Sequence, residues 1–385
     1  MRITSLKVHH LAPRFSVLVV RTDDDSLFGL GEAVLEGKAR VVEAAIRDFE
    51  PLLIGRDPRL IERLWIDMYR TTFYPSGSIL ASAISAVDQA LWDINGKALG
   101  VPVHALLGGR VRDRVRMYRH VNVGDLSADE VARGQDHIDD LVAEAKVAAA
   151  EGFTMVKTAL PGPARGLESA AFVDFQTRRF AALREAVGPE VDIAIDFHGR
   201  VGPGLAKVLI AALAPYSPMF IEEPCLPENV DAMVDIARST PVPIATGERL
   251  FTRWGFREVL EKGAATVLQP DLAHCGGISE GRKIAAMGET YYAQLAPHNP
   301  LGPVNLAASI QLALTVPSFL CQEQLHLGHG ILTQPFAVVD GYVEAPTAPG
   351  LGIELDPDAL ASSTYDGSWR LPHWVDPVDG ALLPW

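Results

Sequence analysis

The sequence contains little cysteine and no long hydrophobic run. Its three cysteines, Cys225, Cys275 and Cys321, are scattered along 385 residues without a C-x-x-C pair. This pattern excludes a disulfide framework or zinc ribbon and indicates a reducing compartment, so we expect a cytoplasmic protein. No apolar run approaches the roughly 18 residues that a membrane helix needs, and residues 1–20 lack a signal-peptide pattern. We therefore expect no membrane partner.

Basic residues are also scarce relative to acidic ones. The chain has 34 Lys and Arg against 48 Asp and Glu, a net charge of −14, and no basic cluster. Since nucleic-acid binding depends on basic patches, we expect no nucleic-acid partner. The acidic balance favours solubility but does not identify a substrate. At 48% hydrophobic residues the core can be large, and the length predicts a large domain with a smaller one.

The first part of the chain mixes strand and helix patterns. Residues 14–35 alternate apolar and polar side chains around Asp23–Asp25, which predicts an antiparallel hairpin or meander. Residues 39–55, 57–73 and 78–100 carry apolar residues at helical spacing. We predict a small α+β domain over residues 1–112.

A repeating strand–helix pattern follows over residues 113–340. Eight short apolar runs end in polar residues, and from the third run onward these ends lie 23 to 27 residues apart, at 196, 222, 248, 271, 298 and 323. Such a period predicts an α/β fold with a parallel barrel of the TIM type. Residues 341–385 are rich in Pro and Gly, and we expect this segment to return to the N-terminal domain.

Acidic side chains end three successive predicted strands. These ends are Asp196, the pair Glu222 and Glu223, and Glu248. Strand alternation lets only one residue of the pair point inward. Because all strand ends of a barrel meet at one rim, the three carboxylates would repel one another unless a hard divalent cation such as Mg²⁺ lies between them. Alternatively, each acid caps a helix or pairs with a base.

Groups for proton transfer follow at other strand ends. Asp271 and His298 end neighbouring strands, His198 lies two residues after Asp196, and Glu323 ends the last strand. A carboxylate beside an imidazole fixes its tautomer and raises its basicity, so His298 with Asp271 and His198 could move two protons. The alternative for His298 is a buried histidine bonded to backbone. Lys157 is either a substrate contact or a solvated strand end.

These motifs together resemble the mandelate racemase subgroup of the enolase superfamily and, within it, the D-galactonate dehydratases. The resemblance covers nearly the whole chain and rests on the combination of GEAVLEGKARVVEAA, SAVDQALWDINGKALGVPV, DFHGRV, FIEEP, GERLF, LQPDLAHCGGI, LAPHNPLGP and PGLGIE. It implies a modified (β/α)7β TIM barrel beneath an α+β capping domain formed by both termini. It also implies a homo-oligomer.

The resemblance further implies a role for each candidate residue. Asp196, Glu222 and Glu248 would bind Mg²⁺. His298, paired with Asp271, would remove the proton α to a substrate carboxylate. His198 would act as the acid that helps a β-hydroxyl leave, and Glu323 would donate a hydrogen bond to the substrate carboxylate. A metal-stabilised ene-diolate is the chemistry already known for this superfamily.

The expected function is a Mg²⁺-dependent dehydratase of an acid sugar, an aldonate of the galactonate kind, that gives a 2-keto-3-deoxy acid. One alternative is a racemase, epimerase or cycloisomerase acting on a sugar acid or its lactone. Another is a non-catalytic protein on a retained barrel. Lys157, Arg14 and Tyr74 are the candidate substrate-binding residues. Ala159 departs from the dehydratase pattern, in which an Asn follows the lysine by two residues.

Overall fold

The computed structural model describes residues 1–75, 77–121, 135–160, 162, 164–371, 373–376 and 378–383. All ten predicted site residues lie within these ranges, whereas the end of the first predicted barrel strand, residues 122–123, lies outside them. In the described part of the chain, no helix combines the length and the apolar character needed to cross a membrane.

An antiparallel sheet begins the chain. Its strands are β1 (Ile3–Leu11), β2 (Phe15–Thr22) and β3 (Phe28–Glu32), and they pair in that order. The turn at Asp23–Asp25 joins β2 to β3, which confirms the predicted hairpin. Helices follow at α1 (Ala39–Asp48), α2 (Glu50–Leu53), α3 (Ile61–Arg70), α4 (Ser78–Leu99) and α5 (Val103–Leu106).

Helix α4 packs directly on β3 and is buried along most of its length. Two glycines of β3 permit this approach, since a Cβ on Gly29 would lie 2.0 Å from the Ala90 carbonyl oxygen and one on Gly31 would lie 1.9 Å from that of Ala86. The helix ends at Gly100, whose φ of 69° is favourable only for residues that tolerate the left-handed region.

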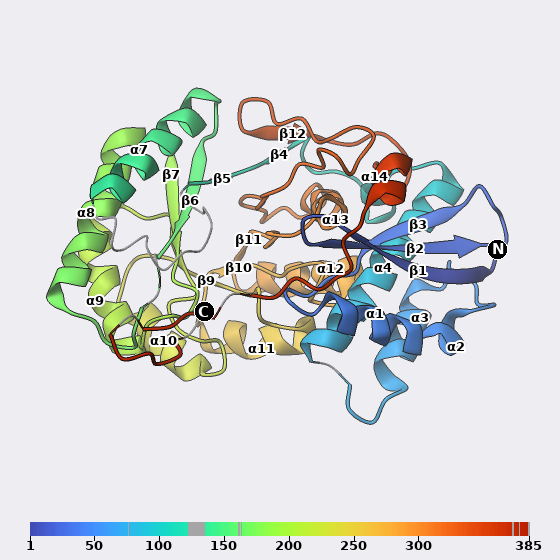
Figure 1. Ribbon diagram of the computed structural model, residues 1–385, viewed down its shortest axis with the longest axis horizontal. Helices are drawn as coiled ribbons and strands as arrows, with labels where there is room; N and C mark the ends of the chain where they lie inside the picture. Colours follow the sequence, from blue (N-terminus) through green and yellow to red (C-terminus); the bar gives the residue numbers. More distant parts are fainter. Residues whose placement is uncertain are drawn as a thin grey trace.

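The parallel barrel occupies the other side of the molecule (Figure 1). One sheet has the order β11-β10-β9-β8-β7-β6-β5, and bridges from Phe319 to Leu295 and from Gln322 to Met117 join residues 319–322 to both sheet edges. The strands are β5 (Arg119–His120), β6 (Met155–Ala159), β7 (Asp192–Asp196), β8 (Phe220–Glu222), β9 (Ile244–Thr246), β10 (Val267–Leu268) and β11 (Gln294–Leu295).

Helices connect the strands and cover the outside of the barrel. They are α7 (Gln135–Ala150), α8 (Ala170–Val187), α9 (Pro203–Leu213), α10 (Val230–Arg238), α11 (Thr252–Lys262), α12 (Gly277–Thr290) and α13 (Pro303–Ala313). The largest hydrophobic cluster lies between these helices and the strands. This arrangement confirms the predicted α/β barrel.

The C-terminal part returns to the N-terminal sheet, as the sequence predicts. Strand β12 (Tyr342–Glu344) pairs antiparallel with β4 (Arg114–Arg116), and the backbone N–H of Leu351 donates to Asp93 of α4. Helix α14 (Pro357–Ser362) lies beside β1. Figure 1 shows the final, red part of the chain crossing the face of the molecule toward the barrel. Both termini therefore build the cap, while the boundaries 1–112, 113–340 and 341–385 stay predictions.

Candidate active site

Half of the candidate residues belong to one layer of side chains inside the barrel. A small apolar cluster contains one interior residue from each of the eight barrel segments: Tyr118, Met155, Ala194, Phe220, Ala245, Val267, Ala296 and Cys321. Residues two positions further along a strand point to the same side. The next interior layer therefore consists of His120, Lys157, Asp196, Glu222, Gly247, Gln269, His298 and Glu323. Five of the ten sequence-predicted site residues belong to this layer, at the carboxyl ends of the strands: Lys157, Asp196, Glu222, His298 and Glu323.

Three carboxylates meet at this layer. One oxygen from each of Asp196, Glu222 and Glu248 lies within 4.8 Å of the others. Glu223, which strand spacing alone could not separate from Glu222, is buried and instead pairs with the partly exposed Arg249. Glu222 lies two residues after the interior Phe220, so strand alternation places Glu222 in the interior layer and Glu223 on the other side. The structure thus selects Glu222.

The donor set fits a hard divalent cation. Asp196 and Glu222 are buried, and Oε1 of Glu222 has no hydrogen-bond partner. Burial and then the neighbouring Asp196 raise the pKa of Glu222 well above its usual value. A cation bound to carboxylate oxygens relieves both the repulsion and the missing contact, which is the coordination that Mg²⁺ and similar ions prefer.

Lys157 is buried between these acids rather than solvated. Its Nζ lies 2.6 Å from Glu222, 3.0 Å from Glu323 and 3.8 Å from Asp196. Although burial opposes it, the charges of Glu222 and Glu323 raise the pKa of Lys157 well above its usual value. Lys157 is therefore a fixed positive charge within the site.

His298 forms the predicted pair with Asp271. Its Nδ1 lies 2.8 Å from Asp271 Oδ2, and its Nε2 lies 3.0 Å from Glu248 Oε2. The side chain is bonded to carboxylates, which rules out the alternative of a histidine bonded to backbone. Despite burial, Glu248 and Glu323 raise the pKa of His298 well above its usual value. In return, the charge of His298 outweighs burial and lowers the pKa of Glu248 to about 2.

His198 lies against the carboxylate group from another direction. Its backbone N–H donates to Asp196 Oδ1 at 2.7 Å, and its Nε2 lies 3.1 Å from Asp196 Oδ2. Its φ of 53° allows both contacts, since it bends the chain directly after β7. Burial and then the charge of Arg200 lower the pKa of His198 well below its usual value. The surroundings thus favour the neutral form of His198 and the charged form of His298.

Glu323 accepts hydrogen bonds from several donors. Its Oε1 lies 2.7 Å from His120 Nε2, and its Oε2 accepts from the backbone N–H of Asn299 at 2.7 Å. Burial opposes ionisation, but Lys157 and His298 hold the pKa of Glu323 well below its usual value. Sequence reasoning missed His120, although it ends a strand as the other site residues do.

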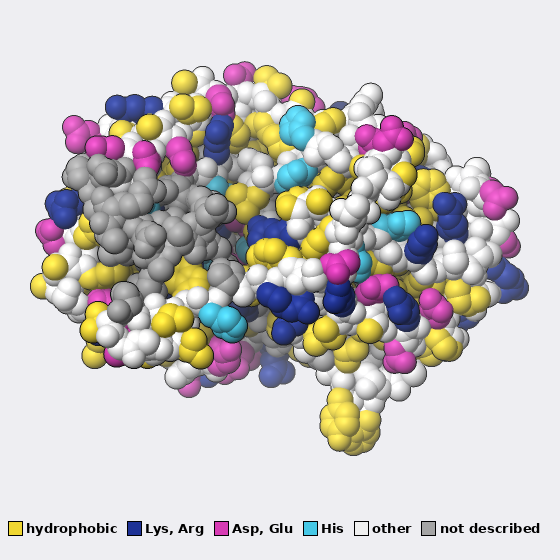
Figure 2. Space-filling view, viewed as in Figure 1, with side chains coloured by type: hydrophobic (Ala, Val, Ile, Leu, Met, Phe, Trp, Pro, Cys, Tyr) yellow, Lys and Arg dark blue, Asp and Glu magenta, His cyan; other side chains and the backbone are white. Residues whose placement is uncertain are grey.

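The remaining substrate-binding candidates lie in different places. Arg14 Nη2 donates to the Pro300 carbonyl at 3.4 Å and its guanidinium lies 5.1 Å from the Trp369 ring, so it reaches the loop after His298. Tyr74 is not brought to the carboxylates: it is 79% exposed on the loop after α3. This loop extends from the molecule in Figure 1, and Figure 2 shows hydrophobic side chains at its tip. Ala159 pairs in register with Asp196, so it lies at the same height as the acids.

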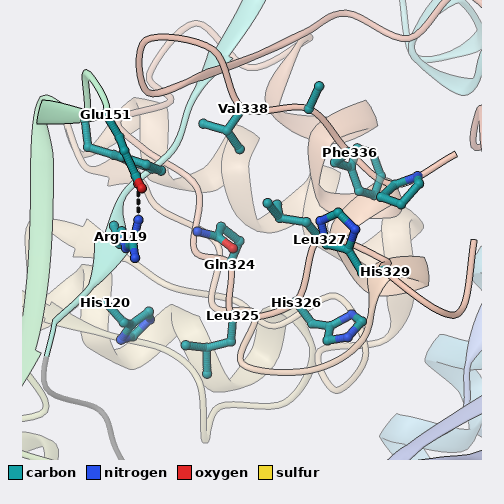
Figure 3. Close-up of a pocket in the computed structure, with 13 residues that line it drawn as sticks. Arg119, His120, Glu151, Gln324, Leu325, His326, Leu327, His329, Phe336 and Val338 are labelled. Atoms are coloured by element: carbon teal, nitrogen blue, oxygen red, sulfur yellow. Dashed lines mark hydrogen bonds and ion pairs between the residues drawn. The ribbon is translucent and has the colours of Figure 1, made fainter. Parts of the chain in front are cut away.

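A cavity of about 870 Å³ lies beside the site. As Figure 3 shows, Arg119 and Glu151 pair on one side, while His326, Leu327 and Phe336 come from the segment after the last barrel strand. His120 lines this cavity and also contacts Glu323. The cavity therefore adjoins the layer of candidate residues through one shared side chain.

Two family models match most of the chain. Residues 5–108 match the mandelate racemase / muconate lactonizing enzyme N-terminal domain, and residues 140–359 match the enolase C-terminal domain-like family. The chain is 43% identical to proteins named D-galactonate dehydratase from Variovorax paradoxus (strain S110) and Ralstonia nicotianae, over the full length of both chains in each case.

Solved structures agree with these matches. A mandelate racemase/muconate lactonizing enzyme from Sulfitobacter sp. superposes with a TM-score of 0.89 at 34% identity, over 97% of this chain and 99% of that one. One from Jannaschia sp. CCS1 gives 0.88 at 33% identity, over 95% and 98%. These similarities extend over both the cap and the barrel.

Proposed function

The chain belongs to the enolase superfamily, in its mandelate racemase and muconate lactonizing enzyme group, and on this premise we propose that it is a Mg²⁺-dependent acid-sugar dehydratase. Its substrate is an aldonate of the galactonate kind, and its product is a 2-keto-3-deoxy acid. The D-galactonate dehydratases at 43% identity support a hydro-lyase with a small-molecule substrate. The three-carboxylate group supports the metal requirement.

The proposed chemistry begins with removal of a proton from the carbon next to the substrate carboxylate. Asp196, Glu222 and Glu248 hold the Mg²⁺, which supplies positive charge that stabilises the anion formed on proton loss. His298 Nε2 accepts the proton, while its Nδ1–H donates to Asp271 and keeps the ring oriented. To do so, Nε2 must first lose its own proton and its contact with Glu248, the carboxylate that favours the charged ring by raising the pKa of His298.

The β-hydroxyl then leaves as water with a proton supplied by His198, and tautomerisation of the resulting enol gives the 2-keto-3-deoxy acid. To supply this proton the His198 ring must be protonated, a form that burial and Arg200 disfavour and that the charge of Glu248 favours. Glu323 and Lys157 face the substrate carboxylate. For Glu323 to donate a hydrogen bond its carboxyl must be protonated, and a second carboxylate placed beside it favours that form by raising its pKa. Arg14 is assigned to the distal hydroxyls, whereas Tyr74 has no role in this proposal.

The observation that carries the proposal is that each ring nitrogen of His298 contacts a different carboxylate, Asp271 on one side and Glu248 on the other. Its Nδ1 side meets Asp271, while its Nε2 side meets the carboxylate group proposed to bind the ion. A potential base is thereby held in contact with the carboxylates that would bind the ion. The expected homo-oligomer and cytoplasmic location stay predictions.

A panel of aldonates and aldarates that includes D-galactonate tests this proposal in the presence of Mg²⁺. The expected result is a semicarbazide-reactive 2-keto-3-deoxy acid from an aldonate, with no product after chelation of the metal. Deuterium uptake from solvent without keto acid would instead identify a racemase, epimerase or cycloisomerase, which shares the first step. Absence of both signals across the panel would reject dehydration and isomerisation alike.

A further inference from the structure

A buried chain of amide side chains connects the cap to the His298–Asp271 pair. The backbone N–H of Glu32, at the end of β3, donates to Gln89 Oε1 at 2.8 Å. Gln89 Nε2 donates to Asn305 Oδ1 at 2.9 Å, and Asn305 Nδ2 donates to Asp271 Oδ1 at 2.9 Å. Gln89, Asn305 and Asp271 are all fully buried. This series of hydrogen bonds therefore runs from the N-terminal sheet through α4 and α13 to Asp271.

The direction of each hydrogen bond in this chain follows from its first donor. A backbone N–H can only donate, so the oxygen of Gln89 faces Glu32 and its NH₂ group faces Asn305. The same constraint then turns the NH₂ group of Asn305 toward Asp271. A second bond from Gln89 Nε2 to the Leu272 carbonyl, at 2.9 Å, agrees with this orientation. A backbone group in the cap thus sets the orientation of an amide beside Asp271.

Asp271 is held by three donors as a result. Oδ1 accepts from the Ala273 backbone N–H at 2.7 Å and from Asn305, which leaves Oδ2 for His298 Nδ1. Asn305 also donates to Asn299 Oδ1 at 2.8 Å, next to His298 in the chain. Rotation of the Asp271 carboxylate would break at least one buried hydrogen bond and leave a buried polar group unsatisfied, which is unfavourable.

We propose that Asn305 and Gln89 are positioning residues for the base, and that docking of the cap orients His298 through them. Asn305 occupies one Asp271 oxygen, so the other oxygen meets the Nδ1–H of His298 and Nε2 is directed into the site. The part of this inference that concerns catalysis rests on the proposed function. The part that concerns the Nδ1–H···Asp271 bond does not depend on any substrate.

Asn305→Ala and Gln89→Met remove the two links, and Asp93→Asn is the matched control. Asp93 lies one helical turn after Gln89 on α4 and, like it, is buried and accepts a backbone N–H from β3, in this case that of Leu30 at 3.0 Å. It also pairs with Lys97 and accepts from Leu351, so its change should lower stability. It has no hydrogen bond to Gln89, Asn305 or Asp271.

The first measurement is proton NMR of the Mg²⁺-loaded protein. The Nδ1–H of His298 is a downfield resonance identified by its loss in His298→Asn. The expected result is faster exchange of this proton with water in Asn305→Ala, a smaller change in Gln89→Met, and no change in Asp93→Asn. An unchanged resonance in Asn305→Ala would overturn the proposal, whatever substrate the enzyme uses.

The second measurement is turnover with substrate deuterated at the α-carbon. Misorientation of the base should lower kcat about tenfold or more with little change in KM, and should raise the isotope effect on kcat as proton removal becomes slower. A residue with a purely structural role would lower the folded fraction and leave the isotope effect unchanged, and this is the result expected for Asp93→Asn. The same result for Asn305→Ala would also overturn the proposal. An inactive wild type with the NMR pattern above would count against the proposed function alone.

Discussion

Glu222 is buried among like charges, and this environment makes it the most informative single residue of the site. Asp196, Glu323 and Glu248 all contribute to the raised pKa of Glu222, and Lys157 is the main group that opposes them. A carboxylate in this situation destabilises the metal-free protein and contributes stability when a cation binds. One substitution can separate the destabilisation of the metal-free protein from the stabilisation on cation binding.

Glu222→Gln should therefore act in opposite directions with and without metal. The metal-free variant should be at least as stable as the metal-free wild type, because one of the repelling charges is gone while an oxygen remains for Lys157. The rise in Tm that Mg²⁺ produces in the wild type, expected from preferential binding to the folded state, should be lost. Thermal unfolding with and without Mg²⁺ measures both, and an equal Mg²⁺-dependent rise in the variant would remove Glu222 from the metal site.

His298→Asn tests the proposed base. The variant keeps a polar side chain but cannot accept a proton, so turnover should fall by about 10²–10⁴-fold or more, the usual range for a positioned acid or base. Mg²⁺ affinity, measured by calorimetry, should remain close to that of the wild type. Turnover at the wild-type rate would exclude His298 from the mechanism.

Much of the candidate site could be predicted from the sequence because barrel geometry repeats. Asp196, Glu248, Asp271 and His298 each follow an apolar run at a regular interval, and parallel strand ends converge. The spacing alone left Glu222 and Glu223 open, because it does not fix which of two consecutive residues points inward, and only the family resemblance favoured Glu222.

Contacts between distant elements were beyond the sequence for another reason. Gln89 and Asn305 are 216 positions apart, and neither ends a strand or carries a charge. Their pairing depends on how α4 and α13 meet. No local pattern signals such a contact, and Tyr74, proposed as a substrate contact from the sequence, shows the converse case of a residue that the fold leaves exposed.

At the scale of elements, the contact between β3 and α4 determines how closely the cap can pack. The glycine alternation in FGLGE is explained by this contact, because side chains at Gly29 and Gly31 would overlap the backbone of α4. Helix α4 in turn reaches the barrel through α12. A small change in β3 should therefore affect the cap as a unit.

Gly31→Ala should destabilise the protein by about 1–3 kcal/mol or more, as overpacking of a buried contact does. Gly204→Ala is the control, because this glycine lies in α9, has no heavy atom within 4 Å of its missing Cβ, and lacks a positive φ. It should be neutral or stabilising by roughly 0.5–1 kcal/mol, the usual advantage of Ala over Gly in a helix. Urea unfolding of both variants measures the difference, and equal stabilities would contradict this account of the packing.

At the scale of the whole molecule, a buried acid joins the cap to the barrel. Asp88 of α4 accepts the backbone N–H of Ser279 at 3.0 Å and its hydroxyl at 2.5 Å, and Ser279 belongs to α12. Burial raises the pKa of Asp88 from 3.8 to about 7, although the bonds from Ser279 oppose this rise. The attachment of the two parts should therefore depend on pH.

The sign of this dependence follows from the raised pKa. The folded state binds the Asp88 proton more tightly than the unfolded state, so Asp88 contributes most stability below about pH 4 and loses it as pH rises through about 7. Each tenfold difference in proton affinity between the two states corresponds to about 1.4 kcal/mol. As pH rises from 4 to 7, Asp88→Asn should thus become more stable relative to the wild type. Above pH 7, the difference in unfolding free energy between the two proteins should be constant. Urea unfolding measures this difference in stability. If it does not change with pH over this range, Asp88 does not titrate there.

The central claim is that carboxylates from three successive strands bind one divalent cation beside His298. Anomalous diffraction from crystals soaked in Mn²⁺, as a heavier substitute for Mg²⁺, tests this claim directly. The account predicts a single peak coordinated by oxygens of Asp196, Glu222 and Glu248, with the His298 ring facing it. A fully substituted crystal with no peak among these three side chains, or with the ion held elsewhere, would contradict the account.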